Sequence, residues 1–201
     1  LIGDRLFVSK YTYGYSRHSF PFSPKIFNGR IFSNLPERGD IIVFKTPADN
    51  RTDYIKRLIG LPGDEIQIIN GKIFINKVPI ERTDPYKSKK INCSNLTNES
   101  KIFTETLSNG VSYIAAYSMS GTMKSSDVYK VPKKHYFFMG DNRDCSKDSR
   151  YLTSVGYVNF DNIVGKARII FFSTNKKEGN IFEIWKWKKI IRFDRFLKKI
   201  K

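Results

Sequence analysis

Few residues of this chain are of the kinds that build metal sites or disulfide frameworks. Its 201 residues include two cysteines and two histidines. Cys93 and Cys145 permit at most one disulfide, which is too few for a disulfide framework or a zinc site. His18 and His135 stand without ligand-type neighbours, so metal catalysis is not expected. We therefore expect no metal and no cofactor, and cysteine usage leaves the compartment open.

Long apolar runs and acidic residues are also scarce. No stretch approaches the about 18 apolar residues that a membrane span requires, and no secretory signal peptide is present. With 36 Lys and Arg against 19 Asp and Glu, the formal net charge is +17. This charge favours an acidic partner, either nucleic acid or an anionic membrane surface. Since the first residue is Leu1 rather than methionine, we expect a piece of a longer protein, with any membrane anchor before this residue.

The apolar segments that are present follow the two-residue period of β-strands. The clearest hairpin joins Glu65–Ile69 to Lys72–Ile75 through Asn70-Gly71, because both turn positions tolerate the positive φ of a type I′ turn. Further strands are expected over residues 6–8, 41–44, 54–59, 136–138 and 164–172. The sequence therefore predicts a mainly β fold built on an antiparallel β-sheet.

A polar, loop-rich stretch separates two parts of this β pattern. We assign residues 1–79 and 134–174 to a discontinuous β core and residues 80–133 to an inserted, smaller β-rich domain. Residues 175–201 form a basic tail. The length of 201 residues is enough to bury a core.

The basic tail has apolar residues at helical spacing. These are Ile190, Phe193, Leu197 and Ile200, and Lys188, Arg192, Arg195 and Lys199 follow another face. With Trp185 and Trp187 at its entry, the pattern predicts an amphipathic helix at a membrane interface. A C-terminal helix that docks its apolar side on the domain explains the pattern equally well.

One lysine lies within an apolar strand. Period two places Lys56 on the same face as Tyr54 and Leu58, and Arg57 on the opposite face. Apolar surroundings disfavour the ammonium and lower its pKa, so the neutral amine would be a general base. Taken alone, Lys56 is more simply explained as a strand lysine that keeps its charged head in water.

A polar loop after the strand at residues 136–138 changes that interpretation. It reads MGDNRDCSKDSR over residues 139–150 and is dense in hydroxyl, carboxylate and guanidinium groups. With the lysine strand, its turn LPGD at 61–64 and the segment PERGDIIVFK at 36–45, it resembles the bacterial type I signal peptidases, serine proteases that use a Ser/Lys pair. The resemblance runs from Leu1 to about Ser173.

The resemblance implies roles for individual residues. Lys56 corresponds to the general base and Ser146 to the hydroxyl that orients it. The loop supports would be the ion pairs Asp148–Arg150 and Arg57–Asp141, together with Gly140. The positions lining the substrate pockets would be Leu6, Val43, Asp53, Tyr54 and Ile55. Cys145 departs from the family, which usually has a polar residue there, and its thiol could be oxidised.

The nucleophilic serine of the family is absent from this chain. In the family, Leu-Ile-Gly-Asp or a close variant follows a Ser-Met-x-Pro-Thr-Leu segment that carries the serine, so the resemblance of Leu1-Ile2-Gly3-Asp4 places the serine about half a dozen residues before Leu1. Residues 118–123 imitate a Ser-Met motif, but they lack the proline and the following Leu-x-Gly-Asp. We therefore treat Ser118 and Ser120 as decoys.

The function implied is a serine endopeptidase that removes N-terminal signal peptides from exported preproteins, cutting after small residues in an A-x-A pattern. It would be a monomer, anchored in the bacterial inner membrane with the catalytic domain on the periplasmic side. Its partners would be preproteins and an anionic membrane surface, and we do not expect nucleic acid. The alternatives are another Ser/Lys protease such as a self-cleaving repressor, a basic β-rich nucleic-acid-binding module, and a membrane-surface module without activity.

Overall fold

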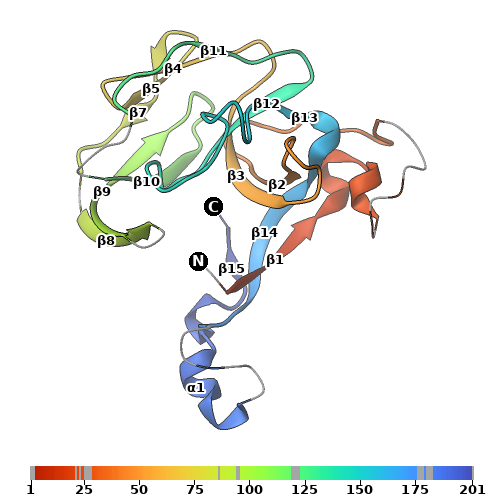
Figure 1. Cartoon of the computed structure of the whole chain (residues 1–201), viewed down its shortest axis with the longest axis vertical. Helices are drawn as coiled ribbons and strands as arrows, with labels where there is room; N and C mark the ends of the chain where they lie inside the picture. Colours follow the sequence, from red (N-terminus) through yellow and green to blue (C-terminus); the bar gives the residue numbers. More distant parts are fainter. Residues whose placement is uncertain are drawn as a thin grey trace.

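Three antiparallel β-sheets make up the regular core of the molecule (Figure 1). The structure is a computed structural model, and it describes residues 3–20, 22, 24, 29–85, 87–93, 96–118, 123–175, 179 and 183–200. The expected mainly β, antiparallel fold is confirmed. Of the segment that imitates a Ser-Met motif, residues 119–122 lie outside the described residues.

The largest sheet has the strand order β1-β14-β2-β3-β12-β13, and β15 pairs with β14 beyond the end of β2. Its strands are β1 (Asp4–Ser9), β2 (Ile41–Lys45), β3 (Asp53–Gly60), β12 (His135–Met139), β13 (Val158–Asn159), β14 (Ile163–Ser173) and β15 (Lys198–Lys199). The alternation expected for β2 is present, because Ile42 and Phe44 are fully buried while their neighbours are half-buried. This alternation fixes the register of β2 against β3.

The hairpin predicted at Asn70-Gly71 is confirmed. It joins β4 (Glu65–Ile69) and β5 (Lys72–Ile75), with Ile69 paired to Lys72. Asn70 and Gly71 have φ of 49° and 71°, as a type I′ turn requires. β6 (Val78–Pro79) and β11 (Tyr129–Lys130) complete this second sheet in the order β11-β4-β5-β6.

The third sheet is formed by the segment expected to be an insertion. It contains β7 (Glu81–Arg82), β8 (Lys87–Cys93), β9 (Leu96–Thr106) and β10 (Ser112–Ser118). β11 also falls within residues 80–133, but it pairs with β4 of the second sheet. One buried cluster unites the sheets, since Leu107 and Tyr113 pack with Ile66 and Phe137. The inserted sheet therefore shares its core with the strands that carry the polar loop.

Short 3-10 helices connect these strands. They are η1 (Lys10–Tyr13), η2 (Arg17–Ser19), η3 (Phe160–Asn162), η4 (Ile184–Lys186) and η5 (Phe193–Arg195). The aromatic-rich segment after β1 is held by η1, η2 and one antiparallel bridge between Tyr15 and Ile31.

The continuous amphipathic helix expected in the tail is not formed. The one α-helix of the described tail, α1, covers only Trp187–Ile190 and is followed by η5 and β15. Tertiary hydrogen bonds override the helical spacing: the backbone N–H of Arg192 donates to the carbonyl of Ser173 at 3.0 Å. Leu197 also has φ of 52°, which a helix does not permit. No helix in the described ranges is long and apolar enough to span a membrane.

The tail returns to the main sheet through an ion pair. The Arg195 guanidinium donates to both carboxylate oxygens of Asp4 on β1, at 3.0 and 2.6 Å. β15 then pairs with β14, with Lys199 opposite Ile169 and Lys198 opposite Ile170. These contacts place the end of the tail beside β1, while α1 extends away from the body of the molecule (Figure 1).

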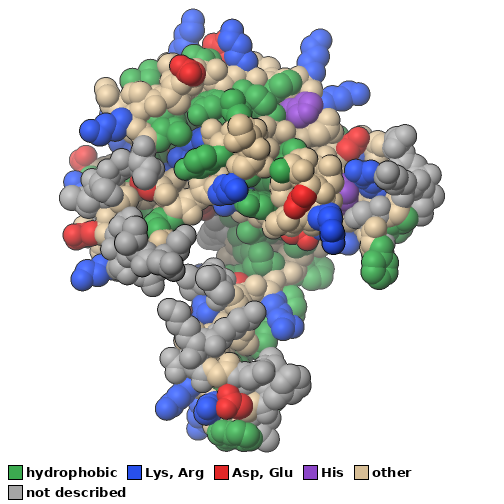
Figure 2. Space-filling view, in the orientation of Figure 1, with side chains coloured by type: hydrophobic (Ala, Val, Ile, Leu, Met, Phe, Trp, Pro, Cys, Tyr) green, Lys and Arg blue, Asp and Glu red, His purple; other side chains and the backbone are tan. Residues whose placement is uncertain are grey.

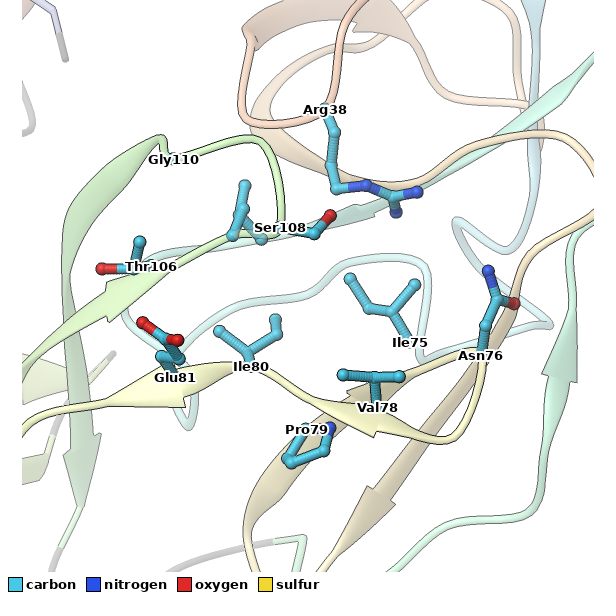
Figure 3. A pocket seen from close by; sticks show the side chains of 11 residues that line it. Arg38, Ile75, Asn76, Val78, Pro79, Ile80, Glu81, Thr106, Ser108 and Gly110 are labelled. Carbon is cyan, nitrogen blue, oxygen red and sulfur yellow. The ribbon is translucent and has the colours of Figure 1, made fainter.

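A cavity of about 490 Å³ lies between β5, β6 and the turn after β9. The side chains of Ile75, Val78 and Ile80 lie on one side, with Ser108 and Arg38 opposite (Figure 3). The Arg38 guanidinium is already paired with the Asp64 carboxylate at 2.9 Å. No residue that lines this cavity belongs to the Lys56 site predicted from the sequence.

Candidate active site

The structure brings Lys56 and Ser146 together. Lys56 lies on β3, and Ser146 lies in the loop that follows β12. The Lys56 Nζ donates to the Ser146 Oγ at 2.8 Å, across a sequence separation of 90 residues. Among the described residues, Ser146 supplies the one hydroxyl that is hydrogen-bonded to this amine. A single hydroxyl therefore fixes the direction in which the amine points.

Burial lowers the pKa of Lys56 from its ordinary value of 10.5. The charges that face the amine act in both directions: Asp148 and Asp141 raise the pKa, and Arg150 lowers it. The ring of Tyr54 lies 5.7 Å from the Nζ and forms part of the apolar surroundings expected from the strand pattern. Loss of hydration is the largest cause, and it favours the neutral amine that a general base requires.

The loop that carries Ser146 is held by a fully buried carboxylate. Asp148 has no exposed surface, and its Oδ2 accepts from the backbone N–H of Gly140 at 2.9 Å. Arg150 donates to the same carboxylate through Nε at 2.8 Å and Nη2 at 2.9 Å. The bidentate pair and the backbone contact together close the turn on both sides of Ser146.

Gly140 is required by the space that Ser146 occupies. A Cβ at this position would lie 2.1 Å from the Ser146 Oγ, 2.5 Å from its Cβ and 3.5 Å from the Lys56 Nζ. Any side chain here would therefore displace the Ser146 hydroxyl. The structure thus shows a steric reason for the glycine of the loop, independent of its backbone conformation.

A second bidentate pair ties the lysine strand to the loop. Arg57 donates to Asp141 through Nε and Nη2, both at 2.8 Å, and through Nη1 to the carbonyl of Gly39 at 2.9 Å. Its side chain is 2% exposed. Because successive strand residues face opposite sides, Arg57 reaches the loop from the side away from the Lys56 amine.

The Lys56 amine opens onto a cleft of about 860 Å³. The cleft is lined by Asp4, Leu6, Ile41, Ile55, Lys56, Arg57, Gly140, Asp141, Ile170, Arg195, Lys198, Lys199 and Ile200. It therefore lies between β1, β3, the Ser146 loop and the end of the tail. Apolar side chains form one part of its wall, and cationic side chains of the tail form another.

The residues expected to line the substrate pockets do not all line the cleft that contains Lys56. Leu6 and Ile55 line the cleft with Lys56. Val43 and Asp53 line a separate cavity of about 460 Å³, and Asp53 pairs with Lys45 at 2.9 Å. Tyr54 lines neither cavity and packs against a buried cluster, with its ring 6.2 Å from that of Phe44.

Two features of the site have no local signal in the sequence. Cys93 and Cys145 form a disulfide across 52 residues, whereas sequence spacing left their pairing open. Glu105 and Arg143 form a buried ion pair at 2.7 Å between the inserted sheet and the Ser146 loop. Arg143 stands within the loop pattern, but an isolated glutamate in the inserted segment gives no indication of its partner.

Replacing Gly140 with alanine tests the steric constraint. Gly140→Ala should displace Ser146, break its hydrogen bond to Lys56 and destabilise the fold by about 1–3 kcal/mol. The Lys56 pKa, measured by NMR titration of its Nζ, should change. Gly110→Ala is the control, because its Cβ would meet no atom within 4 Å and should cost only backbone strain. An unchanged Lys56 titration in Gly140→Ala would contradict the steric argument.

The lowered Lys56 pKa predicts a pH-dependent stability. Between the folded-state pKa and the ordinary value of 10.5, the unfolded chain binds more protons, so the free energy of unfolding rises with pH. Below the folded-state pKa, Lys56 is charged in both the folded and the unfolded chain, and the cost of desolvating the ammonium lowers the free energy of unfolding by its full amount. Lys56→Met should therefore stabilise the protein most at low pH, and the gain should shrink as the pH rises through this window.

The measurement is the difference in melting temperature between wild type and Lys56→Met from pH 6 to pH 10. Lys72→Met, which removes an exposed lysine of β5, is the matched control and should show a constant difference. A constant difference for Lys56→Met as well would show that the amine is not desolvated.

Comparison with known proteins gives a consistent result. The family model described as "Signal peptidase, peptidase S26" matches residues 1–172. The signal peptidase I of Rickettsia bellii (strain OSU 85-389) is 40% identical over 218 aligned residues, covering 100% of this chain and 73% of that protein. The signal peptidase I of Rickettsia akari (strain Hartford) is 46% identical over 189 residues, covering 87% of this chain and 66% of that protein.

A crystal structure of a signal peptidase I from Enterococcus faecalis V583 is 27% identical, with a TM-score of 0.40, and the match covers 66% of this chain and 97% of that one. The family model spans most of the chain, and the two Rickettsia relatives are 40% and 46% identical over 73% and 66% of their own length. The chain therefore belongs to the signal peptidase I family, peptidase S26, the serine proteases that remove signal peptides.

Proposed function

We propose that Lys56 is the general base of this signal peptidase and that Ser146 orients it. The observation that carries the proposal is the 2.8 Å hydrogen bond between a half-buried amine of lowered pKa and a hydroxyl in a loop held by two bidentate ion pairs. A serine hydroxyl is a weak nucleophile until a base removes its proton, and a neutral lysine amine can do so.

The proposed reaction moves one proton through Lys56. The neutral Nζ takes the proton of the nucleophilic serine as the serine oxygen attacks the scissile carbonyl. The resulting ammonium returns the proton to the departing amine, which leaves an acyl-enzyme. Lys56 then takes a proton from water, whose oxygen attacks the ester, and the serine regains its proton when the signal peptide departs.

The nucleophilic serine is proposed to come from residues that precede Leu1. Asp4 and Leu6 of β1 line the same cleft as Lys56, so a segment entering β1 arrives close to the amine. About half a dozen extended residues span about 20 Å, which gives such a segment room to follow the cleft. Ser146 cannot take this role while its hydroxyl is committed to orienting the amine.

The cleft favours small side chains on the substrate. Leu6 and Ile55 line its apolar part, and small apolar pockets there would select an A-x-A sequence by excluding larger side chains. The peptide would bind as an added strand along the segment containing Tyr54, through main-chain hydrogen bonds. Val43 and Asp53 would contact residues further along the peptide, because they line the neighbouring cavity.

The tail is proposed to contact an anionic membrane surface. Trp185, Phe193 and Leu197 are 75%, 60% and 71% exposed. Lys188 and Lys189 lie on α1, between Trp185 and Phe193 in the chain. On the described tail, Lys and Arg side chains lie beside hydrophobic ones (Figure 2). Exposed aromatic and cationic groups together favour an interface of lipid headgroups. The domain would act as a monomer on the periplasmic side of the inner membrane.

The catalytic proposal predicts a gain of activity when the missing motif is restored. A Ser-Met-x-Pro-Thr-Leu segment added before Leu1 should allow cleavage of a peptide with an A-x-A site. Lys56→Met and Lys56→Arg should each abolish this cleavage, since a guanidinium remains protonated. The rate should rise with pH through the Lys56 pKa, because the base must be neutral.

The control is the 201-residue chain, which should not cleave the peptide. Cleavage by this chain that disappears in Ser118→Ala or Ser120→Ala would place the nucleophile inside the chain and contradict the proposal. Turnover retained by Lys56→Met in the extended protein would exclude Lys56 as the base.

The membrane proposal predicts salt-sensitive binding to vesicles. Removing residues 185–201 should reduce co-sedimentation with anionic vesicles, and binding by the intact chain should weaken as salt increases. Neutral vesicles serve as the lipid control. If the shortened chain sediments with anionic vesicles as well as the intact chain does, the contact lies elsewhere.

A further inference from the structure

The side chain of Arg143 leaves the Ser146 loop and enters the inserted sheet. It is 1% exposed, and its Nη2 donates to the Glu105 Oε2 at 2.7 Å and to the Tyr113 hydroxyl oxygen at 3.0 Å. Arg143 is three positions before Ser146 in the chain. Its partners belong to β9 and β10, so an anchor of the loop is supplied by the insertion.

Glu105 is a buried acceptor with a donor on each of its two oxygens. It is 2% exposed, and it accepts from the Tyr113 hydroxyl at 2.9 Å and from the Tyr117 hydroxyl as well as from Arg143. Burial raises the pKa of both phenols, that of Tyr117 to about 12, so both hydroxyls remain donors. A carboxylate with donors on both oxygens holds the guanidinium in one place.

The backbone of the loop also rests on the edge of β10. The Ala116 N–H donates to the Asp141 carbonyl at 2.8 Å, and the Arg143 N–H donates to the Ala116 carbonyl at 2.9 Å. The disulfide between Cys93 of β8 and Cys145 adds a covalent link next to Ser146. The stretch of the loop immediately before Ser146 is therefore attached to the insertion at several points.

The same insertion contacts the lysine strand. The Arg57 guanidinium carbon lies 4.1 Å from the centroid of the Tyr113 ring, and Arg57 is the neighbour of Lys56. Tyr113 thus touches the strand of the base through its ring and Glu105 through its hydroxyl. Tyr113 therefore links the strand that carries Lys56 to the carboxylate that holds Arg143 of the Ser146 loop.

We propose that Glu105 is a positioning residue of this peptidase, which anchors Arg143 in the inserted sheet and thereby sets where the loop presents Ser146 to Lys56. A displaced Arg143 would also move its carbonyl, which accepts from the Arg150 Nη2. Arg150 in turn holds Asp148. This inference rests on the proposed roles of Lys56 and Ser146.

The test is Glu105→Gln in the protein with the upstream serine motif restored. We expect kcat to fall on the order of ten to a hundredfold, as for other small misplacements of catalytic groups, with little change in KM because Glu105 does not line the cleft. Ile73→Ala is the control, because it truncates a residue of the buried cluster that contains Tyr113, and an aliphatic side chain forms no hydrogen bond with Arg143 or Glu105. It should lower the melting temperature without a comparable loss of kcat.

A second measurement does not depend on activity. In the 201-residue chain, NMR titration of the Lys56 Nζ should show a pKa closer to the ordinary 10.5 in Glu105→Gln than in wild type. The reason is that a loosened loop admits water to the amine. The charged groups that face the amine are Asp148, Arg150 and Asp141, and all of them stay in the variant.

The variant can fail to fold, because an unpaired Arg143 would remain buried. Tyr117→Phe then provides the milder test, since it removes one donor to Glu105 and keeps the ion pair; it should lower kcat by a smaller factor. Glu105→Leu with Arg143→Met removes both charges. The comparison is informative when the double variant regains the wild-type melting temperature. If Glu105 has a structural role alone, kcat is then restored as well. If Glu105 positions the loop, kcat stays low.

The outcomes separate this inference from the proposed function. A Lys56 pKa in wild type that matches the exposed lysines would overturn the proposed base. A lowered pKa in wild type that is unchanged in Glu105→Gln, with kcat within about twofold of Ile73→Ala, would overturn the positioning role alone.

Discussion

The candidate site depends on a Lys56 amine that is half-buried and has one described hydrogen-bond partner, the Ser146 hydroxyl. Burial lowers its pKa, and the Ser146 hydroxyl accepts its one described hydrogen bond. A buried ammonium is costly unless it is paired, so the neutral form is favoured. The site therefore needs a hydroxyl placed within hydrogen-bond distance on a chain segment 90 residues away. Most other polar contacts around the cleft serve that placement.

The part of this arrangement that could be predicted from the sequence is local. Period two in β3 places Lys56 and Arg57 on opposite faces, and the structure has this arrangement. Asn70-Gly71 predicts its hairpin through backbone conformation alone. Gly140 belongs to the same loop pattern, although its steric reason appears only when Ser146 and Lys56 are placed around it. Predictions from local sequence succeed where the residues that determine a conformation belong to the segment that adopts it.

The part that could not be predicted depends on contacts between distant segments. The tail has helical spacing, but Arg192 and Arg195 bond to Ser173 and Asp4, and these bonds bend the chain away from a helix. Glu105 gives no signal in sequence, because its role is defined by Arg143, 38 residues away. Spacing likewise cannot tell whether two cysteines meet. In the tail, tertiary hydrogen bonds override the local helical propensity, and in the other two cases the partner is fixed only by the fold.

The buried arginines around Lys56 are each paired with a carboxylate, so they leave little unbalanced charge beside the amine. Arg57, Arg143 and Arg150 are 2%, 1% and 4% exposed, and each has its own carboxylate. An unpaired guanidinium near Lys56 would lower the amine's pKa further, and an unpaired carboxylate would raise it. Because each of these three arginines is paired with Asp141, Glu105 or Asp148, they add little net charge beside Lys56, and the other cationic groups of the cleft come from the tail. Loss of hydration is therefore the largest cause of the lowered Lys56 pKa.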